Sequence, residues 1–161
     1  GLSRFEPVRW RSRALEVTLA GHAITVVDDT YNANPDSVRA AIEVLAELPG
    51  PRLLVLGDMG EVGHQGSQFH AEVGAHARAM GVEKLFTLGS QAAQAGVSFG
   101  ASRHFDDIAA LNAAVLAELP RCASVLVKGS RFMQMERVVQ AILARAQRPV
   151  PPQQEKEGHA A

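Results

Sequence analysis

The sequence is poor in the features that mark several protein classes. It has one cysteine, Cys122, in 161 residues, so no disulfide can form within the chain. No apolar run approaches the ~20 residues that span a bilayer, and the first residues lack the apolar core and cleavage site of a signal peptide. With 16 basic and 17 acidic residues the formal net charge is −1, so no broad basic field favours nucleic acid or an anionic membrane. We therefore expect a cytoplasmic protein, monomeric, with no nucleic-acid or membrane partner.

The composition is that of an ordinary globular protein. Hydrophobic residues make up 47% of the chain and charged residues 20%, so one domain can bury a core without disulfides. The chain begins without Met, in sequence typical of the middle of a protein, and we expect a piece of a longer chain. From residue 148 the sequence is rich in Pro and Gln. We expect one domain over residues 1–147 and a disordered tail over residues 148–161.

Short apolar runs alternate with segments of helical period along this domain. We expect strands at Ala14–Leu19, His22–Asp28, Arg52–Gly57, Lys84–Gly89, Arg103–Phe105 and Ser124–Lys128. We expect helices from the N-cap Asn34 to about Leu48, and over Ser67–Met80, Gln91–Ala95, Asp107–Leu119 and Phe132–Ala146. Ala20-Gly21-His22 indicates an antiparallel hairpin, whereas helices separate the later strands. The prediction is an α/β fold, a Rossmann-like, doubly wound, mostly parallel sheet of about six strands with the N-terminal hairpin at one edge.

Polar segments follow three of these strands, at the positions where such sheets bind ligands. The first segment, residues 28–35, reads DDTYNANP. Asp28 and Asp29 point to opposite faces while the strand lasts, so at most one faces a given ligand. A carboxylate here can accept hydrogen bonds from ribose hydroxyls. Asn34 has two interpretations that the sequence leaves open: it faces a ligand, or it only caps the helix that follows.

The second segment, residues 57–63, reads GDMGEVG. Its glycine spacing is neither the dinucleotide fingerprint G-x-G-x-x-G nor a Walker loop. Asp58 and Glu61 would repel phosphate in the absence of a metal ion and suit an ammonium group better. The alternative is that the glycines serve only a tight turn.

The third segment, residues 127–131, reads VKGSR and runs from a strand end to a helix start. Ser130 is a candidate N-cap, and Lys128 and Arg131 add positive charge beside the helix dipole. This arrangement suits a carboxylate or a phosphate. The plainer alternative is a pair of solvated basic residues around a capped helix.

The sequence shows no pattern of metal ligands or of an activated nucleophile. His64, His70 and His76 are spaced six residues apart, a rotation of about 600° on a helix, so their rings face different ways. No His-x-x-x-His and no Cys pair is present. We expect no metal ligand and no catalytic residue in this chain. For His70 we expect a structural hydrogen bond, and for Cys122 the role of a small apolar side chain.

The three segments, taken in order, resemble the C-terminal domain of the Mur ligases. The matching sequence is DDTYNANPDS, then LVLGDMGEVG followed by HAEVG at residues 70–74, then LVKGSRFMQME, within a match over about residues 5–146. It is most similar to the branch of the family that adds D-alanyl-D-alanine (D-Ala-D-Ala). In this family the domain is the third of the enzyme and has a Rossmann-like sheet. It closes over a central ATP-binding domain, and an N-terminal domain holds the UDP-sugar.

The resemblance implies an ATP-dependent amide ligase of bacterial peptidoglycan synthesis. In the family reaction, ATP phosphorylates the terminal carboxylate of UDP-N-acetylmuramoyl-tripeptide (UDP-MurNAc-tripeptide), and the amine of D-Ala-D-Ala attacks the acyl phosphate. The lysines that serve the phosphates and Mg²⁺ belong to the central domain. The resemblance therefore implies that ATP and Mg²⁺ are held mainly outside this chain, and that the chain alone is inactive.

The resemblance also implies a nucleotide-binding set. Asp29 matches the family position that approaches the nucleotide, and Tyr31 and Asn34 lie on the same loop. Arg11 matches an arginine that reaches ATP within the family segment P-x-x-G-R. Trp10 stands where that segment has Gly, and because a Trp does not adopt a Gly-only backbone at low cost, we expect the local chain path to differ.

A dipeptide-binding set follows from the same resemblance. Lys128, Ser130 and Arg131 match the strip near the incoming D-Ala-D-Ala, whose carboxylate needs a cationic partner. Asp58 matches a position that can hold the amine of the dipeptide.

Two other functions are alternatives to the hypothesis that this chain is part of a ligase. A stand-alone module of the same sheet type would bind a nucleotide or a small acid without catalysis. A strand followed by G-x-x-G-K-T/S, encoded upstream of Gly1, would separate the two, because the module needs no such loop. An NAD-dependent oxidoreductase domain would need G-x-G-x-x-G after the first strand, which the sequence lacks.

Overall fold

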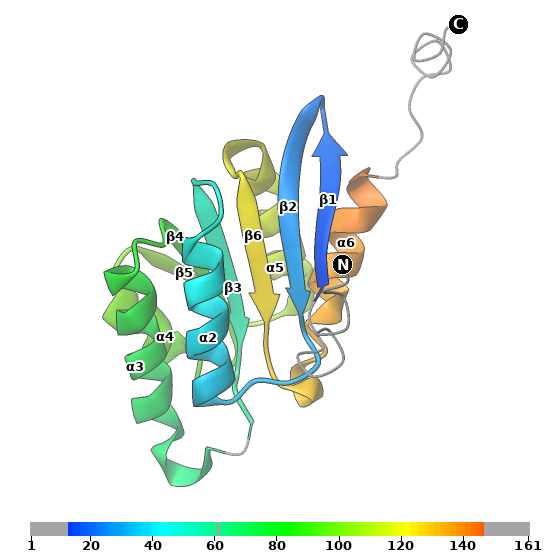
Figure 1. Ribbon diagram of the computed structural model, residues 1–161. Helices are drawn as coiled ribbons and strands as arrows, with labels where there is room; N and C mark the ends of the chain where they lie inside the picture. The colour runs from blue at the N-terminus through cyan, green and yellow to red at the C-terminus, as the bar shows by residue number, and fades with distance from the viewer. Residues whose placement is uncertain (1–12, 61, 147–161) are drawn as a thin grey trace, which may run out of the picture.

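The computed structural model describes residues 13–60 and 62–146, which form one mixed sheet with helices on both faces (Figure 1). The elements are β1 (Arg13–Leu19), β2 (His22–Asp29), α2 (Pro35–Ala46), β3 (Arg52–Gly57), η2 (Gly63–Gln65), α3 (Gly66–Ala79), β4 (Lys84–Leu88), α4 (Ala93–Phe99), β5 (Ser102–Phe105), α5 (Ile108–Glu118), η3 (Leu119–Arg121), β6 (Ser124–Lys128), η4 (Arg131–Met133) and α6 (Glu136–Ala146). The strand order is β1-β2-β6-β3-β4-β5. β1 pairs antiparallel with β2, and all other pairs are parallel. The predicted sheet and its edge hairpin are confirmed.

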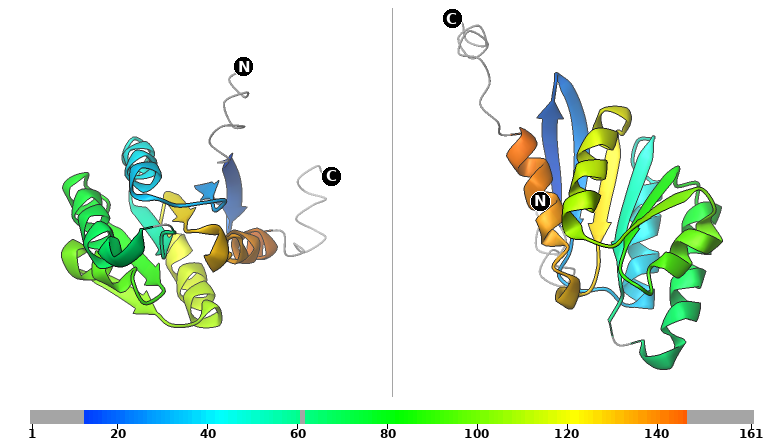
Figure 2. Two further views of the ribbon diagram at one scale, coloured as in Figure 1. Left: turned by 90° about the horizontal axis from the view of Figure 1, so that it is seen from below. Right: turned by 180° about the vertical axis from the view of Figure 1, so that it is seen from behind.

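The helices form two layers (Figure 2). α2, α3 and α4 pack on one face through residues such as Val38, Val73 and Phe99, and α5 and α6 pack on the other through residues such as Leu111 and Val138. β6 in the middle of the sheet is buried on both faces, which explains its unbroken apolar run. α2 packs on β6 and β3, so within the described chain no helix covers β1 and β2 on that side (Figure 1).

The hairpin turn forms as the sequence predicts. Ala20 and Gly21 occupy its two central positions with φ of 53° and 78°, the left-handed pair that matches the twist of two-residue hairpins. β2 runs one residue further than predicted, because Asp29 still pairs with Lys128 of β6. Asp29 is therefore the last residue of a strand.

Two predicted helices were wrong in their bounds. The helix expected at Gln91–Ala95 lies at Ala93–Phe99, because the carboxylate of Asp58 holds the N–H groups of Gln91 and Ala92 in the preceding turn. The helix expected from Phe132 is divided into η4 and α6, because Gln134 between them has a left-handed φ of 53°. The other helices match within about two residues, the usual ambiguity of helix ends.

The burial of two residues near the ends of elements follows from their positions. Met80, predicted as the last residue of the helix Ser67–Met80, lies just past the end of α3 and is 37% exposed. Cys122 is buried as expected, and burial raises the pKa of its thiol to about 11, which fits an unreactive apolar role. None of the described helices is both long and apolar enough to cross a bilayer. The predicted tail at residues 148–161 lies outside the described residues.

Candidate ligand-binding rim of the sheet

The three polar segments meet at one rim of the sheet, as predicted. β2, β6 and β3 are parallel neighbours, and Lys128 is in register with both Asp29 and Leu56. Two backbone bonds then join the segments, one from Gly60 N–H to the carbonyl of Ala33 (2.9 Å) and one from Ser130 N–H to the carbonyl of Asp58 (3.0 Å). We call this edge, formed by residues 29–34, 58–60 and 128–131, the polar rim.

A buried ion pair lies at the centre of the polar rim. The ammonium of Lys128, a residue only 2% exposed, is 3.0 Å from Oδ1 of Asp29 and donates to the carbonyl of Asn32 (2.9 Å). Burial raises the pKa of Asp29 and lowers the pKa of Lys128, because it disfavours the charged form of each, and their attraction opposes both shifts. Lys128 thus fastens the loop after β2 to the end of β6.

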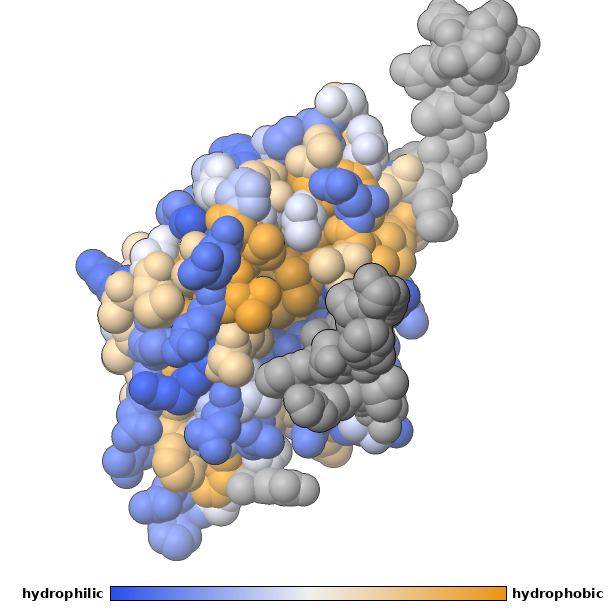
Figure 3. Space-filling view, viewed as in Figure 1, coloured by the Kyte–Doolittle hydropathy of each residue, from blue (hydrophilic) through white to orange (hydrophobic). Residues whose placement is uncertain are grey.

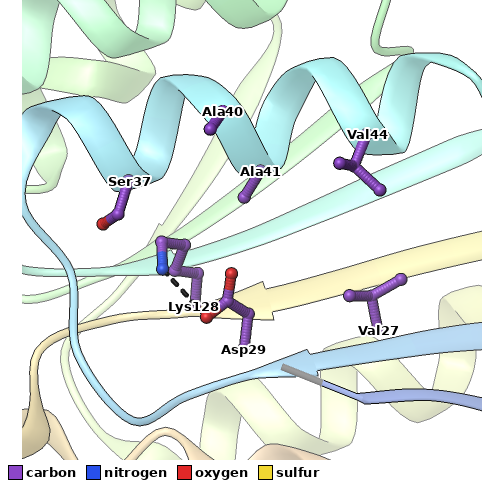
Figure 4. Close-up of a pocket in the computed structure, with 7 residues that line it drawn as sticks. All are labelled: Val27, Asp29, Ser37, Ala40, Ala41, Val44 and Lys128. Carbon is purple, nitrogen blue, oxygen red and sulfur yellow. Dashed lines mark ion pairs between the residues drawn. The ribbon is translucent and has the colours of Figure 1, made fainter. Parts of the chain in front are cut away.

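The pair borders a pocket of about 330 Å³ between β2 and α2 (Figure 4). The pocket is lined by Val27, Asp29, Ser37, Ala40, Ala41, Val44 and Lys128. In the space-filling view an apolar patch lies beside α2 where the sheet is uncovered (Figure 3). The second carboxylate oxygen of Asp29 has no partner among the described residues and points toward the pocket (Figure 4). Apolar walls with one free acceptor at the end suit a ligand with a flat apolar body and hydroxyl donors.

Asp28 and Asp29 have separate partners, which confirms that they point to opposite faces. Oδ2 of Asp28 accepts from Arg13 (2.9 Å) and Oδ1 accepts from the hydroxyl of Thr30 (2.7 Å). Both oxygens of Asp28 are engaged on the hairpin side. Of the two acids, Asp29 is the one that faces the pocket.

Asn34 caps α2, which agrees with its interpretation as a helix cap. Its side-chain oxygen accepts from Ser37 N–H (2.9 Å), and its own N–H donates to the hydroxyl of Ser37 (3.0 Å), a reciprocal capping box. Tyr31 lies on the same loop, 41% exposed, with the guanidinium of Arg131 over its ring at 4.7 Å from the centroid. This cation–π contact places Arg131, expected near the dipeptide, against the loop expected to meet the nucleotide.

Asp58 caps a turn from a distant part of the chain, whereas the side chain of Ser130 caps no helix. Oδ1 of Asp58 accepts from the N–H groups of Gln91 (3.1 Å) and Ala92 (2.7 Å), so this oxygen caps the turn before α4. Ser130 is 7% exposed and makes no side-chain cap, which corrects its predicted role as an N-cap. Only a short η4 turn, and no α-helix, begins there.

The glycines of the second and third segments allow a close approach of strand ends. A Cβ on Gly129 would lie 2.5 Å from Cγ of Met135 and 3.3 Å from Cα of Gly57, so neither strand end has room for a side chain. At Gly57 and Gly129, packing rather than phosphate binding explains the glycine.

His70 holds the second segment against α3. Its buried ring accepts the N–H of Met59 at Nε2 (2.9 Å) and bonds the carbonyl of Gly66 from Nδ1 (2.7 Å). Because a backbone N–H can only donate and a carbonyl can only accept, the ring is neutral with its proton on Nδ1. The predicted structural hydrogen bond is confirmed.

Not every candidate can be placed, and the sequence missed some residues. Arg11, like Trp10, lies outside the described residues. Asp106 and Asp107 follow β5 at the same edge and line a second pocket with Phe132 and Arg137. The rule that ligands bind beyond strand ends would have identified the two acids. Nothing in the sequence marks Phe132 or Arg137, which lie within a predicted helix.

The fold and the rim define an α/β domain whose polar groups gather beyond the carboxyl ends of parallel strands, the position where such sheets bind ligands. A family model described as "Mur ligase, glutamate ligase domain" matches residues 13–131. The chain belongs to this family.

Proteins with similar sequences are ligases of one name. The UDP-N-acetylmuramoyl-tripeptide–D-alanyl-D-alanine ligase of Escherichia coli is 39% identical over 132 residues, which cover 81% of this chain and 29% of that protein. The ligase of the same name from Bacillus subtilis is 32% identical, over a match that covers 80% of this chain and 30% of that protein. The chain thus spans about three tenths of the length of these relatives.

Solved structures with the same fold are also Mur ligases. A crystal structure of MurF from Acinetobacter baumannii aligns with TM-score 0.70 at 30% identity, over 80% of this chain and 29% of that one. MurF from Thermotoga maritima, solved in complex with ADP, aligns with TM-score 0.69 at 25% identity, over 81% of this chain and 30% of that one.

Proposed function

We propose that this chain is the C-terminal, substrate-capturing domain of a bacterial ATP-dependent ligase that joins D-Ala-D-Ala to UDP-MurNAc-tripeptide. The reaction belongs to cytoplasmic peptidoglycan synthesis and so supports cell shape and division. The observation that carries the proposal is the polar rim, where a pocket that suits a nucleoside lies beside an exposed cation, Arg131, that can meet a carboxylate. The Escherichia coli and Bacillus subtilis relatives, each matched over about four fifths of this chain, are ligases of the same name.

The residues of the rim fit the nucleoside part of ATP better than its phosphates. The free oxygen of Asp29 can accept from ribose hydroxyls, and the apolar wall formed by Val27, Ala41 and Val44 can receive a base. Among the described residues no group of three or more His, Cys, Asp or Glu side chains is arranged to hold a metal ion. As the family resemblance implies, we propose that the rest of a longer protein holds the triphosphate and Mg²⁺, and we expect this chain alone to be inactive.

The contribution of this chain to catalysis is to position the nucleotide and the dipeptide. Tyr31 and Asn34 shape the loop beside the nucleotide, while Ser130 and Arg131 and the second oxygen of Asp58 border the path of the dipeptide. Lys128 holds these two sides together through Asp29. Bringing an amine and an activated carboxyl group into line accounts for a large part of the rate of such reactions.

The test uses the full-length protein that carries this chain. With ATP, UDP-MurNAc-tripeptide and D-Ala-D-Ala, we expect phosphate release and formation of the pentapeptide product, identified by mass. Asp29→Asn removes a charged acceptor, and we expect it to raise the KM for ATP about tenfold, the equivalent of one hydrogen bond to a charged group.

Asp28→Asn is the matched control, because its carboxylate is bonded to Arg13 and Thr30. We expect its KM for ATP to stay near that of the wild type. A wild-type protein that forms no amide product would overturn the proposed function. An unchanged KM in Asp29→Asn would remove only the role of Asp29.

A further inference from the structure

Among the histidines of the described chain, only His70 is buried, with no exposed surface. A histidine in a core needs a partner for each ring nitrogen, because an unpaired buried polar atom is costly. Nδ1 donates to the carbonyl of Gly66 in the first turn of α3, and Nε2 accepts the N–H of Met59 from the loop after β3. One ring nitrogen thus serves the helix, and the other serves the polar rim.

The loop of residues 58–60 is the middle segment of the polar rim. Two backbone bonds tie it sideways, one to the segment after β2 and one to the segment after β6. Among the bonds to the backbone of this loop in the described chain, only that of Met59 to His70 reaches a helix. Without it, the loop would be held only by the two segments that it joins.

A second set of contacts joins the first turn of α3 to the side chain of Asp58. Oδ1 of Asp58 accepts from the N–H groups of Gln91 and Ala92. The side-chain amide of Gln91 in turn lies against Gly66, where a Cβ would overlap its oxygen. Because His70 bonds the carbonyl of Gly66, these contacts close a ring around Asp58. They leave Oδ2 of Asp58, which has no partner in the described chain, in a fixed place.

We propose that His70 is a positioning residue for the ligation, which through Met59 fixes the free oxygen of Asp58 beside the path of the dipeptide. The imidazole itself touches no substrate, because it is fully buried. A misplacement of about 1 Å can slow a reaction that depends on alignment about 100-fold. Asp29 is held separately by Lys128, so binding of the nucleotide does not depend on His70. The proposal rests on the proposed function and adds to it a residue that acts from beneath the site.

The test replaces one ring nitrogen at a time in the full-length protein. In His70→Gln the side-chain oxygen reaches about as far as Nε2 and can accept the N–H of Met59. In His70→Asn the shorter amide reaches about as far as Nδ1, so it can bond the carbonyl of Gly66 but not Met59. We expect His70→Asn to lower kcat/KM for D-Ala-D-Ala at least about tenfold and His70→Gln to stay within about threefold of the wild type. Both should leave the KM for ATP unchanged.

Ser124→Ala is the matched control. Ser124 is buried at the other end of β6, and its hydroxyl donates to the carbonyl of Pro49 (2.8 Å). The change therefore also removes a buried bond from a side chain to the backbone, but far from the polar rim. It should lower the Tm and leave all kinetic constants unchanged.

Equal losses of kcat/KM in His70→Gln and His70→Asn would overturn the proposal, and so would full activity in a folded His70→Asn. If His70→Asn does not fold, His70→Gln decides alone. A folded Gln variant with wild-type kinetics supports the bond to Met59 as the one that matters, and a tenfold loss contradicts it. A wild type without any ligation overturns the proposed function itself, which makes the two failures distinguishable.

Discussion

Lys128 is the residue on which the geometry of the polar rim depends most. A buried lysine is stable only with partners for its charge, and here one carboxylate and one carbonyl supply them. Removing the ammonium would leave the carboxylate of Asp29 enclosed without a cation. Such broken buried pairs cost about 3–5 kcal/mol, far more than a pair on the surface.

We therefore expect Lys128→Met to lower the free energy of unfolding of the 161-residue chain by about 3 kcal/mol. Lys84→Met is the control, because Lys84 pairs with Glu118 at 3.4 Å while 46% of its side chain is exposed, and we expect a loss under about 1 kcal/mol. Urea unfolding measures both. In Lys128→Met the added change Asp29→Asn should recover part of the loss. Equal losses in the two lysine variants would contradict the buried pair.

The sequence could predict that Lys128 lies at a strand end, but not where its ammonium points. The carbonyl of Asn32 that it meets is 96 positions away in the chain, and no local pattern encodes that contact. For Asp58 the same limit applies, because its partners are backbone N–H groups of Gln91 and Ala92. For His70 the sequence could predict a structural hydrogen bond, but it could not predict that the partner is the N–H of Met59.

At the scale of elements, the most extensive contact between two helices of the described chain is that of α3 with α4. Gly74 lies in the contact, and a Cβ there would overlap the backbone carbonyl of Ala95 and come 2.5 Å from the hydroxyl of Ser98. A backbone atom cannot yield as a flexible side chain can. The glycine is therefore a packing requirement of these two helices.

We expect Gly74→Ala to destabilise the 161-residue chain by about 1–3 kcal/mol, the usual result of overpacking. Helix propensity alone predicts the opposite sign, because Ala stabilises a helix interior by about 1 kcal/mol over Gly. Thermal unfolding followed by circular dichroism separates the two. A raised Tm would show that α3 and α4 can move apart freely.

Elements with a strong period were predictable, and elements shaped by tertiary contacts were not. The buried stripe of α2 and the apolar run of β6 are visible in the sequence. The break before α6 is not, because Gln134 is an ordinary residue in a left-handed conformation. Sequence spacing therefore gives the sheet and its order of helices, while the turn that brings Arg137 to the second pocket requires the structure.

At the scale of the whole molecule, the ligand-facing groups all lie on one side. The two pockets flank the polar rim, one over β2 and α2 and one beyond β4 and β5. Both are open on the side that no described element covers, so each can enclose only part of a ligand. A site built this way gains most of its affinity when a second body closes over it.

We therefore expect the 161-residue chain to bind ATP and D-Ala-D-Ala weakly, with a Kd in the millimolar range. The full-length protein that carries the chain should bind ATP at least about 100-fold more tightly, since closure adds the phosphate contacts and removes water. Isothermal titration of both proteins with both ligands measures the difference. Affinities for ATP that agree within a few-fold would mean that these strand ends form a complete site, as a stand-alone binding module requires.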